Sequence, residues 1–321
     1  AQARQGRLRP LTLAECVEDQ GRFLEPLEAT IQALCAEPTW VMPAHDRRLQ
    51  NFRGETIDID LGSSHLAWEL ATVDYLLGDR LSPDEKDGAW SEPYLNDWGH
   101  GTGATPSLMG FGEEDQFVVI TDGQPQMNLV LFWRNGIPPG WQQLPGTPSP
   151  RIAGQLPVTM GDPSLTQIQS EQSVVVAGYG ALVVNNHPRN IPWYLPRQAA
   201  TLLISYLGSN PRHQPYGVQK FAWDPDARAL RESWVNKTVS SPSAVPIVGV
   251  GSDTVYLIGA RANRWTLEAM DWSSGESRFH YVIGGQRYNV LFSGTLLDED
   301  GRIHYGTPWG RVRLIPAGGS Q

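Results

Sequence analysis

Cysteine is scarce in this chain, and long apolar runs are absent. Cys16 and Cys35 are the only cysteines among 321 residues, and no stretch approaches 18 consecutive apolar residues. A membrane-spanning helix is therefore not expected, and a mean hydropathy of -0.33 is that of a protein that works in water. On one straight helix the two cysteines would lie about 28 Å apart. They could form a disulfide only if the chain bends at Pro26, so they leave the redox compartment open.

Several sequence signatures of function are also missing. The formal net charge is -9, the pI is near 5.3 and no basic run occurs, so we expect no nucleic-acid partner. His-x-x-x-His, Cys-x-x-Cys and EF-hand spacings are absent, which argues against zinc sites and standard calcium loops. Gly-x-Ser-x-Gly is absent too, so a serine-hydrolase elbow has no support. The first seven residues lack an apolar region, so a signal peptide was either removed or never present.

The first part of the chain is acidic and has helical periodicity. Residues 1–95 hold 9 Lys and Arg against 17 Asp and Glu, whereas the remainder holds 16 against 17. Apolar spacing over 11–37 predicts a helix, bent or interrupted at Pro26, with Thr12 and Glu15 as a capping box. A second helix is predicted from about Ile59 to a stop at Gly78. We therefore expect an α-helical segment over 1–84.

The period changes after this segment. Residues 85–105 are rich in Asp, Gly, Pro and Ser and are predicted to be a linker. Short runs with β propensity then follow, each bounded by Gly, Asp, Asn or Pro. They occupy residues 117–120, 129–132, 174–176, 182–184 and 255–258.

Residues 106–318 also repeat with a period of about 47. The matched pairs are Asp224 and Asp271, Trp234 and Tyr281, Asp253 and Asp300, and Gly259 and Gly306. Looser copies of the last segment occur at 115–121 and 180–186. Repeats of this length built from short strands are typical of β-propeller blades. The predicted fold is mainly β: a propeller, possibly incomplete because about four units are found, preceded by a short α-helical segment. The Pro-rich stretches 137–163 and 187–215 are expected to be long loops.

Two family resemblances follow from particular motifs. Residues 37–46, 51–54, 59–61 and 74–79 resemble the N-terminal helical part of heparinase II/III-like polysaccharide lyases, over about 8–83. Residues 99–110, 119–123, 171–176, 267–275 and 298–306 are similar to quinoprotein-like propellers of the pyrroloquinoline-quinone repeat type, over about 96–316.

The resemblances imply different functions. The second implies a propeller acting as a binding or scaffold module, with catalysis left open or with quinone-dependent oxidoreduction as an alternative. The first implies β-elimination of uronate-containing polysaccharides, although the catalytic Asn, His and Tyr of that family do not map onto residues of this chain. Together they favour a small-molecule or polysaccharide partner, and a periplasmic or secreted location over the cytoplasm. Ca²⁺ and pyrroloquinoline quinone are the cofactors to consider.

Candidate site residues fall in both segments. In the first, Trp40 could stack on a sugar, and His45 with Asp46 could act as acid or base; packing and capping are the alternative roles. In the second, seven polar residues lie next to predicted strand ends, where they could gather around a central channel and hold Ca²⁺ or cap turns. These seven are His100, Asp122, Asn128, Glu171, Asn185, Asn186 and His187.

Overall fold

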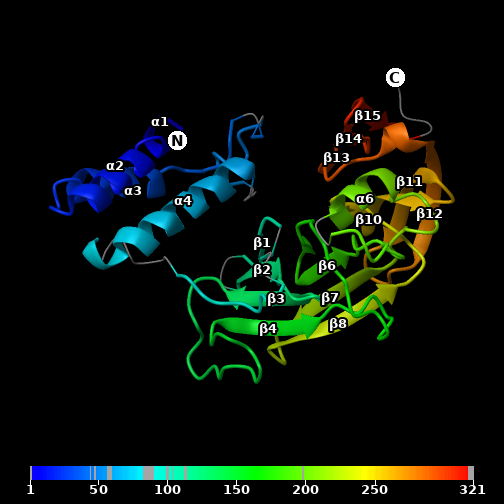
Figure 1. Ribbon diagram of the computed structural model, residues 1–321, viewed down its shortest axis with the longest axis horizontal. Coiled ribbons are helices and arrows are strands. Elements are labelled where there is room, and N and C mark those ends of the chain that lie inside the picture. Colours follow the sequence, from blue (N-terminus) through cyan, green and yellow to red (C-terminus); the bar gives the residue numbers. More distant parts are fainter. Residues whose placement is uncertain are drawn as a thin grey trace. The chain divides into compact units, whose positions relative to one another are not determined.

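The chain divides into two compact units, Ala1–Glu92 and Pro93–Gln321, which we call the head and the body. The computed structural model describes residues 2–43, 45–46, 48–55, 60–81, 90–98, 101–102, 104–111, 114–196 and 199–316. Helices make up the regular structure of the head, and sheets dominate the body (Figure 1). Within these described ranges, no helix combines the length and the apolar character needed to cross a bilayer.

The head is a small helical bundle. Its helices are α1 (Gln2–Gln5), α2 (Leu8–Glu18), α3 (Leu24–Cys35) and α4 (Leu61–Leu77), and a 3₁₀ turn η1 (Gly78–Arg80) follows the last. Helix α2 packs against both α3 and α4. The aliphatic side chains on the facing sides form one core, which consists of Leu8, Leu27, Ile31, Leu34, Leu66, Val73, Leu77 and Leu81.

The first predicted helix is in fact two helices, and Pro26 does not separate them. Pro26 lies in the first turn of α3, where its missing N–H has no helical partner to lose. The break falls at 19–23, where Asp19 adopts a left-handed φ of 54° and Gly21 a φ of 81°. Cys16 and Cys35 therefore lie on different helices; both are exposed, and no disulfide joins them.

Thr12 and Glu15 do not form the predicted capping box. Both lie inside α2, where the Thr12 hydroxyl donates to the Leu8 carbonyl at 2.7 Å. The Glu15 carboxylate instead accepts from the N–H groups of Gly21 and Phe23, at 2.7 and 3.0 Å. Burial raises the pKa of Glu15, but these bonds and the Arg80 guanidinium lower it more, so the net shift is downward. Glu15 thus stabilises the turn between α2 and α3.

Helix α4 ends at Leu77 with Gly78 as its C-cap, as predicted. Its start is fixed by a capping box, because Asp60 Oδ1 accepts from the Ser63 N–H at 2.8 Å and Ser63 Oγ accepts from the Asp60 N–H at 2.8 Å. Ile59, the predicted first residue, lies outside the described residues, and α4 begins at Leu61.

The described part of the body forms four consecutive antiparallel sheets, each a meander in chain order. The first sheet consists of β1 (Ser107–Met109), β2 (Phe117–Thr121), β3 (Asn128–Trp133) and β4 (Ile152–Pro157). The second consists of β5 (Val175–Ala177), β6 (Gly180–Val184), β7 (Val218–Asp224) and β8 (Ala229–Asn236). The third sheet consists of β9 (Ile247–Gly249), β10 (Thr254–Arg261), β11 (Arg264–Asp271) and β12 (Ser277–Gly284). The fourth consists of β13 (Thr295–Leu297), β14 (Ile303–Thr307) and β15 (Gly310–Leu314). The predicted strand runs all fall within or overlap these strands.

The sheets are arranged as propeller blades. The first strand of each sheet contacts the first strand of the next, β1 with β5, β5 with β9 and β9 with β13. Hydrophobic clusters fill the space between successive sheets. Four-stranded meanders whose first strands lie side by side are the units of a propeller. The predicted fold class is therefore confirmed, and we number the sheets as blades 1 to 4; the described part of blade 4 has three strands.

The 47-residue repeat joins equivalent positions of successive blades. Asp224 and Asp271 end the third strands of blades 2 and 3, and Trp234 and Tyr281 lie in the fourth strands. Asp253 and Asp300 precede the second strands of blades 3 and 4, which contain Gly259 and Gly306. The looser copies at 115–121 and 180–186 cover β2 and β6, the second strands of blades 1 and 2.

The Pro-rich stretches are less uniform than predicted. Residues 137–163 contain β4, so they are two connections separated by a strand. Residues 187–215 belong to a long connection inside blade 2 that contains the helix α6 (Ala199–Leu207). The Ser205 carbonyl in α6 accepts hydrogen bonds from the side chains of Gln286 and Asn289. This connection therefore reaches from blade 2 to the segment between blades 3 and 4.

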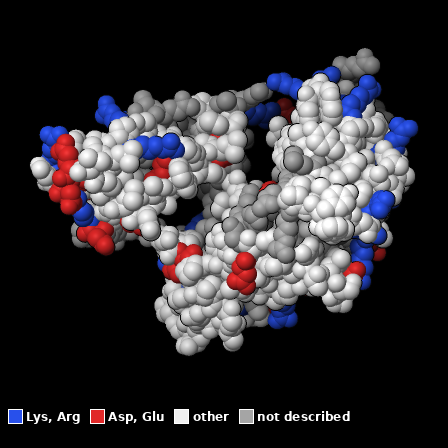
Figure 2. Space-filling model, in the orientation of Figure 1, with Lys and Arg blue, Asp and Glu red and all other residues white. Residues whose placement is uncertain are grey.

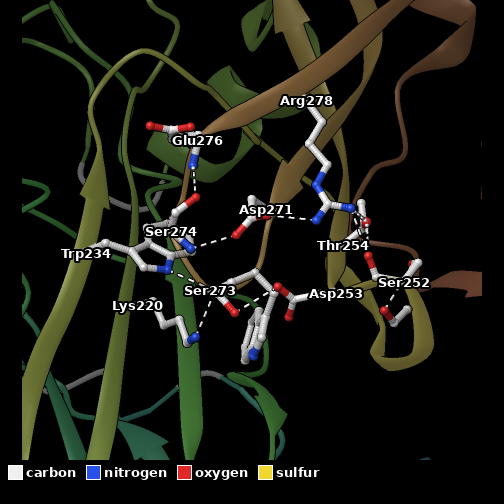
Figure 3. Close-up of polar contacts among 12 residues, drawn as sticks. Lys220, Trp234, Ser252, Asp253, Thr254, Asp271, Ser273, Ser274, Glu276 and Arg278 are labelled. Atoms are coloured by element: carbon white, nitrogen blue, oxygen red, sulfur yellow. Dashed lines mark hydrogen bonds and ion pairs between the residues drawn. The ribbon is translucent and has the colours of Figure 1, made fainter.

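Blades 2 and 3 are joined by contacts between the buried Lys220, which Figure 3 labels, and Trp272. Lys220 Nζ on β7 donates to the Trp272 carbonyl at 2.7 Å and lies 4.3 Å from the Trp272 ring centroid. Burial lowers the pKa of Lys220, although Asp253 and Asp271 act in the opposite direction. Gly180 on β6 faces the same ring and leaves no room for a Cβ.

Candidate functional site

The candidate residues of the head have structural contacts. Trp40 Nε1 donates to the Leu34 carbonyl at 2.7 Å, and its ring packs on the helical core. Asp46 is buried and accepts from the N–H groups of Asn51 and Phe52. Burial raises the pKa of Asp46, but these bonds outweigh it and leave the pKa below its usual value. These contacts match the packing and capping roles.

His45 is half-exposed and pairs with the N-cap of α4. Its Nδ1 lies 2.7 Å from Asp60 Oδ2, which also accepts from the Met42 N–H at 2.9 Å. The Asp60 carboxylate therefore links the loop after α3 to the start of α4. A catalytic role for His45 and Asp46 stays a prediction.

In the body, the candidate residues lie on one face of the blades. In a four-stranded meander, the connection between the second and third strands and the connection to the next blade emerge on the same side. We call this side the connection face; its described residues include 122–127, 158–174, 185–196, 199–217 and 237–246. Asp122, Glu171, Asn185, Asn186 and His187 lie in these segments, and Asn128 begins β3 beside them. His100 lies outside the described residues.

Asp122 and Asn128 close the turn between β2 and β3. Asp122 Oδ1 accepts from the Asn128 N–H at 2.8 Å, and Oδ2 accepts from Asn128 Nδ2 at 2.6 Å. Burial raises the pKa of Asp122 despite these bonds, and the nearby Asp97 raises it further. Part of the predicted linker borders this turn, because the Trp98 N–H donates to the Gly123 carbonyl at 3.0 Å.

Asn186 ties three segments of the connection face together. Its side-chain oxygen accepts from the Glu171 N–H at 2.9 Å and from the Ser170 hydroxyl at 3.2 Å. Its amide nitrogen donates to the carbonyls of Ser241 and Pro242, at 3.3 and 2.9 Å. Asn186 is buried, so it acts as an anchor between the connections that precede β5 and β9.

Asn185 also has its side-chain groups engaged. Its Nδ2 donates to the Tyr216 carbonyl at 3.2 Å, and its Oδ1 accepts from the His187 N–H at 2.9 Å. These bonds join the two ends of the long blade 2 connection.

A small cavity of about 50 Å³ brings Asp122 and Glu171 together. Its lining also includes Gly101, Thr102 and Ser170, and the buried Thr102 hydroxyl has no hydrogen-bond partner among the residues that the structure describes. The volume suits one or two water molecules.

The geometry does not favour calcium at this position. Both Asp122 oxygens already accept from N–H donors, and those donors would face a bound cation. Across the described ranges, no three His, Cys, Asp or Glu side chains group as metal ligands would. Pyrroloquinoline quinone stays a prediction.

A larger cavity of about 620 Å³ lies on the same face, and we call it the connection-face cavity. Three connections line it, those between β4 and β5, β6 and β7, and β8 and β9. The lining contains the predicted residues Asn185 and His187 and also several that sequence reasoning missed. Those missed are Met160, Asp162, Ser164, Leu165, Thr166, Gln167, Pro188, Arg189, Asn190, Tyr216 and Lys237.

The charged groups at this cavity are few. Arg189 and Lys237 supply two cations, and Asp162 supplies one carboxylate. On the face that Figure 2 displays, Lys and Arg lie in separate small groups, most of them near its margin. The cavity is within the 300–1,000 Å³ range of ligand sites, and its lining mixes apolar surface with hydrogen-bonding side chains. Such a lining can orient a polar molecule of small size.

The comparisons with known proteins find relatives at the level of sequence and fold. The chain is 42% identical over 223 residues to an uncharacterized protein of Archaeoglobus fulgidus. The matched region covers 68% of this chain and 42% of the relative. The chain thus spans less than half the length of that relative. No family model matches.

Three solved structures resemble it at low identity. BamB from Moraxella catarrhalis has a TM-score of 0.37 at 12% identity, covering 66% of this chain and 46% of that one. Sqt1 of Saccharomyces cerevisiae has a TM-score of 0.33 at 9% identity, covering 70% and 52%. A europium-containing methanol dehydrogenase has a TM-score of 0.29 at 12% identity, covering 64% and 29%. The comparisons give no support to the heparinase resemblance.

Proposed function

We propose that the body is a ligand-binding module and that the connection-face cavity is its binding site. The observation that carries this proposal is the cavity itself, which has a volume of about 620 Å³ and is lined by connections from two neighbouring blades. Propellers commonly carry function on the loops at one end of the blades, where rigid strands hold variable segments.

The lining residues support a polar ligand of small size. Thr166 and Gln167 have no side-chain hydrogen bond within the described part of the chain, so their hydroxyl and amide groups are available. Among the described contacts, the Asn190 side chain uses its amide nitrogen alone, which donates to the Arg212 carbonyl at 2.7 Å. Hydroxyl and amide groups of this kind recognise polyhydroxylated molecules such as sugars.

The supporting walls of the cavity are well held. Gln219 on β7 is fully buried, and its side-chain oxygen accepts from the N–H groups of Thr159 and Met160, at 2.9 and 2.8 Å. Asn186 anchors the connections on the other side. A preformed cavity lowers the conformational cost of binding.

Ligand-detected NMR tests the proposal. Glucose, glucuronate and glucose 6-phosphate are mixed in turn with the full chain, and saturation transfer is measured. We expect transfer to at least one of them, and its loss in Thr166→Trp, which places an indole into the cavity. Ala227→Trp is the matched control, because Ala227 is exposed in the β7–β8 turn on the opposite face. Absence of transfer from all three, or equal transfer in Thr166→Trp, would overturn the proposal.

A further inference from the structure

The connection-face cavity is more basic than the chain as a whole. The full sequence has a formal net charge of -9, yet among the described residues the charged side chains that line the cavity are Arg189, Lys237 and Asp162. One positive charge therefore remains after Asp162 is set against one of the two cations. A cavity with low-dielectric walls strengthens the field of such a charge.

Arg189 is positioned by hydrogen bonds of its backbone and by a contact with an aromatic ring, without an ion pair between its guanidinium and a described carboxylate. Its N–H donates to the His213 carbonyl at 3.0 Å, and its carbonyl lies 3.1 Å from His213 Nδ1. Its guanidinium lies 5.4 Å from the Tyr216 ring centroid. No ion pair to Arg189 occurs among the described residues. The guanidinium donors therefore stay available to an anion, and their planar fork suits two oxygens at once.

Lys237 lies on a different wall, beside Asp162. The Asp162 Oδ1 accepts from the hydroxyl and the N–H of Ser164, at 2.6 and 3.0 Å. These bonds lower the pKa of Asp162, and Lys237 lowers it further, so the carboxylate stays ionised near neutral pH. The aliphatic stem of Lys237 lies against Gly161, which leaves no room there for a Cβ. Asp162 partly balances Lys237, and Arg189 is the unbalanced cation.

We propose that the cavity selects an anionic, hydroxylated ligand, a sugar acid or a sugar phosphate, whose oxyanion contacts Arg189 and Lys237. This inference rests on the proposed function of the same cavity. The hydroxyl groups of the ligand bond to Thr166, Gln167 and the free side-chain oxygen of Asn190. Carboxylate and phosphate share the oxyanion chemistry that Arg189 recognises, so the experiment separates them.

Isothermal titration calorimetry at low ionic strength compares glucuronate, glucose 6-phosphate and glucose as probes. We expect a charged sugar to bind about 10-fold or more tightly than glucose, because a charge-assisted hydrogen bond in such a site supplies that factor. Whichever charged probe binds tighter identifies carboxylate or phosphate as the preferred group. Added salt should weaken the charged probe and leave glucose unchanged.

Three variants complete the test, and two of them, Arg189→Gln and Arg264→Gln, change the net charge equally. Arg189→Gln should lose about 10-fold or more in affinity for the charged probe, and Arg189→Lys should lose less because it keeps the charge. Arg264→Gln is the matched control, an exposed arginine in the β10–β11 turn that does not line the cavity. Arg189 is itself exposed, so unchanged thermal unfolding is expected in all three.

The outcomes separate the two proposals. Charged probes that bind no tighter than glucose, or equal losses in Arg189→Gln and Arg264→Gln, would overturn the anion inference. If glucose binds and Thr166→Trp removes that binding, the cavity remains a ligand site and only its charge preference is wrong. If no probe binds the wild-type chain, both proposals fail.

Discussion

Gly180→Ala is expected to weaken the packing of blade 2 against blade 3. A Cβ at Gly180 would lie 2.7 Å from Trp272 Cζ2 and 2.8 Å from Lys220 Cε, closer than non-bonded carbon atoms approach each other. The backbone of Gly180 has ordinary dihedral angles, so the effect is one of packing alone. Trp272 cannot withdraw freely, because Lys220 Nζ and Trp234 Nε1 both donate to its carbonyl, at 2.7 and 3.0 Å.

Overpacking of this kind costs about 1–3 kcal/mol of the free energy of unfolding. For a unit of this size we expect the melting temperature to fall by about 2–12 °C. Calorimetry of the full chain measures it. Gly136→Ala is the matched control, because a Cβ there meets nothing within 4 Å, and its change should stay within about 0.5 kcal/mol.

A double-mutant cycle with Trp272→Ala tests the assigned cause. In the Trp272→Ala background the ring is absent, and the Lys220 side chain that packs against this ring can then move away from a Cβ at Gly180. Gly180→Ala should therefore cost less than half as much. Equal costs in both backgrounds, or a Gly180→Ala melt that matches Gly136→Ala, would refute the assignment of this contact between blades.

Two further predictions concern the turns of the blades. Arg278 donates to Asp271 and lowers the pKa of Asp271 from 3.8 to about 2, together with the Ser274 N–H (Figure 3). The stability that ionised Asp271 contributes is therefore fully present above about pH 4 and is lost as the pH falls toward 2. Asp271→Asn should flatten this part of the curve of unfolding free energy against pH, measured by urea titration. An unchanged slope between pH 4 and pH 2 would contradict the prediction. Asn186→Ala should lower the free energy of unfolding by about 1–3 kcal/mol, because it leaves buried groups without partners, whereas Gln167→Ala, at an exposed residue with ordinary φ, should change it little. Equal urea midpoints for these two variants would count against the anchoring role of Asn186.

The sequence predicted the blades because their turn chemistry repeats. Asp224 and Asp271 recur at the ends of third strands, where each side chain accepts the N–H of the third following residue and so shapes the turn to the fourth strand. Such local chemistry is visible in a single sequence. The helix α6 was missed because it lies in a Pro-rich stretch, with prolines at 192 and 196 just before it, and such a stretch predicts a loop.

The capping box was misplaced for a related reason. Thr12 and Glu15 have the required spacing, but spacing alone does not show where a helix begins, and the chain is already helical from Leu8. Pro26 was taken as a break, although proline is equally suited to the first turn of a helix.

The candidate site was predicted only in part. Asp122, Glu171, Asn185, Asn186 and His187 do lie on one face, because polar residues at equivalent strand ends share a side of the blades. Arg189 and Lys237 carried no signal, since only the folding of separate connections brings them to one cavity. The neighbourhood of Arg189 was marked just by its proline content, which predicts a loop but not the segments that the loop contacts.

Amide hydrogen exchange of the full chain with and without saturating glucuronate, or glucose 6-phosphate if that probe binds tighter, tests the account most directly. The account predicts slower exchange in residues 159–167, 185–190 and 237–239, which border the cavity. Exchange that slows only in the turns at 250–253 and 272–276, on the opposite side of the blades, would contradict it.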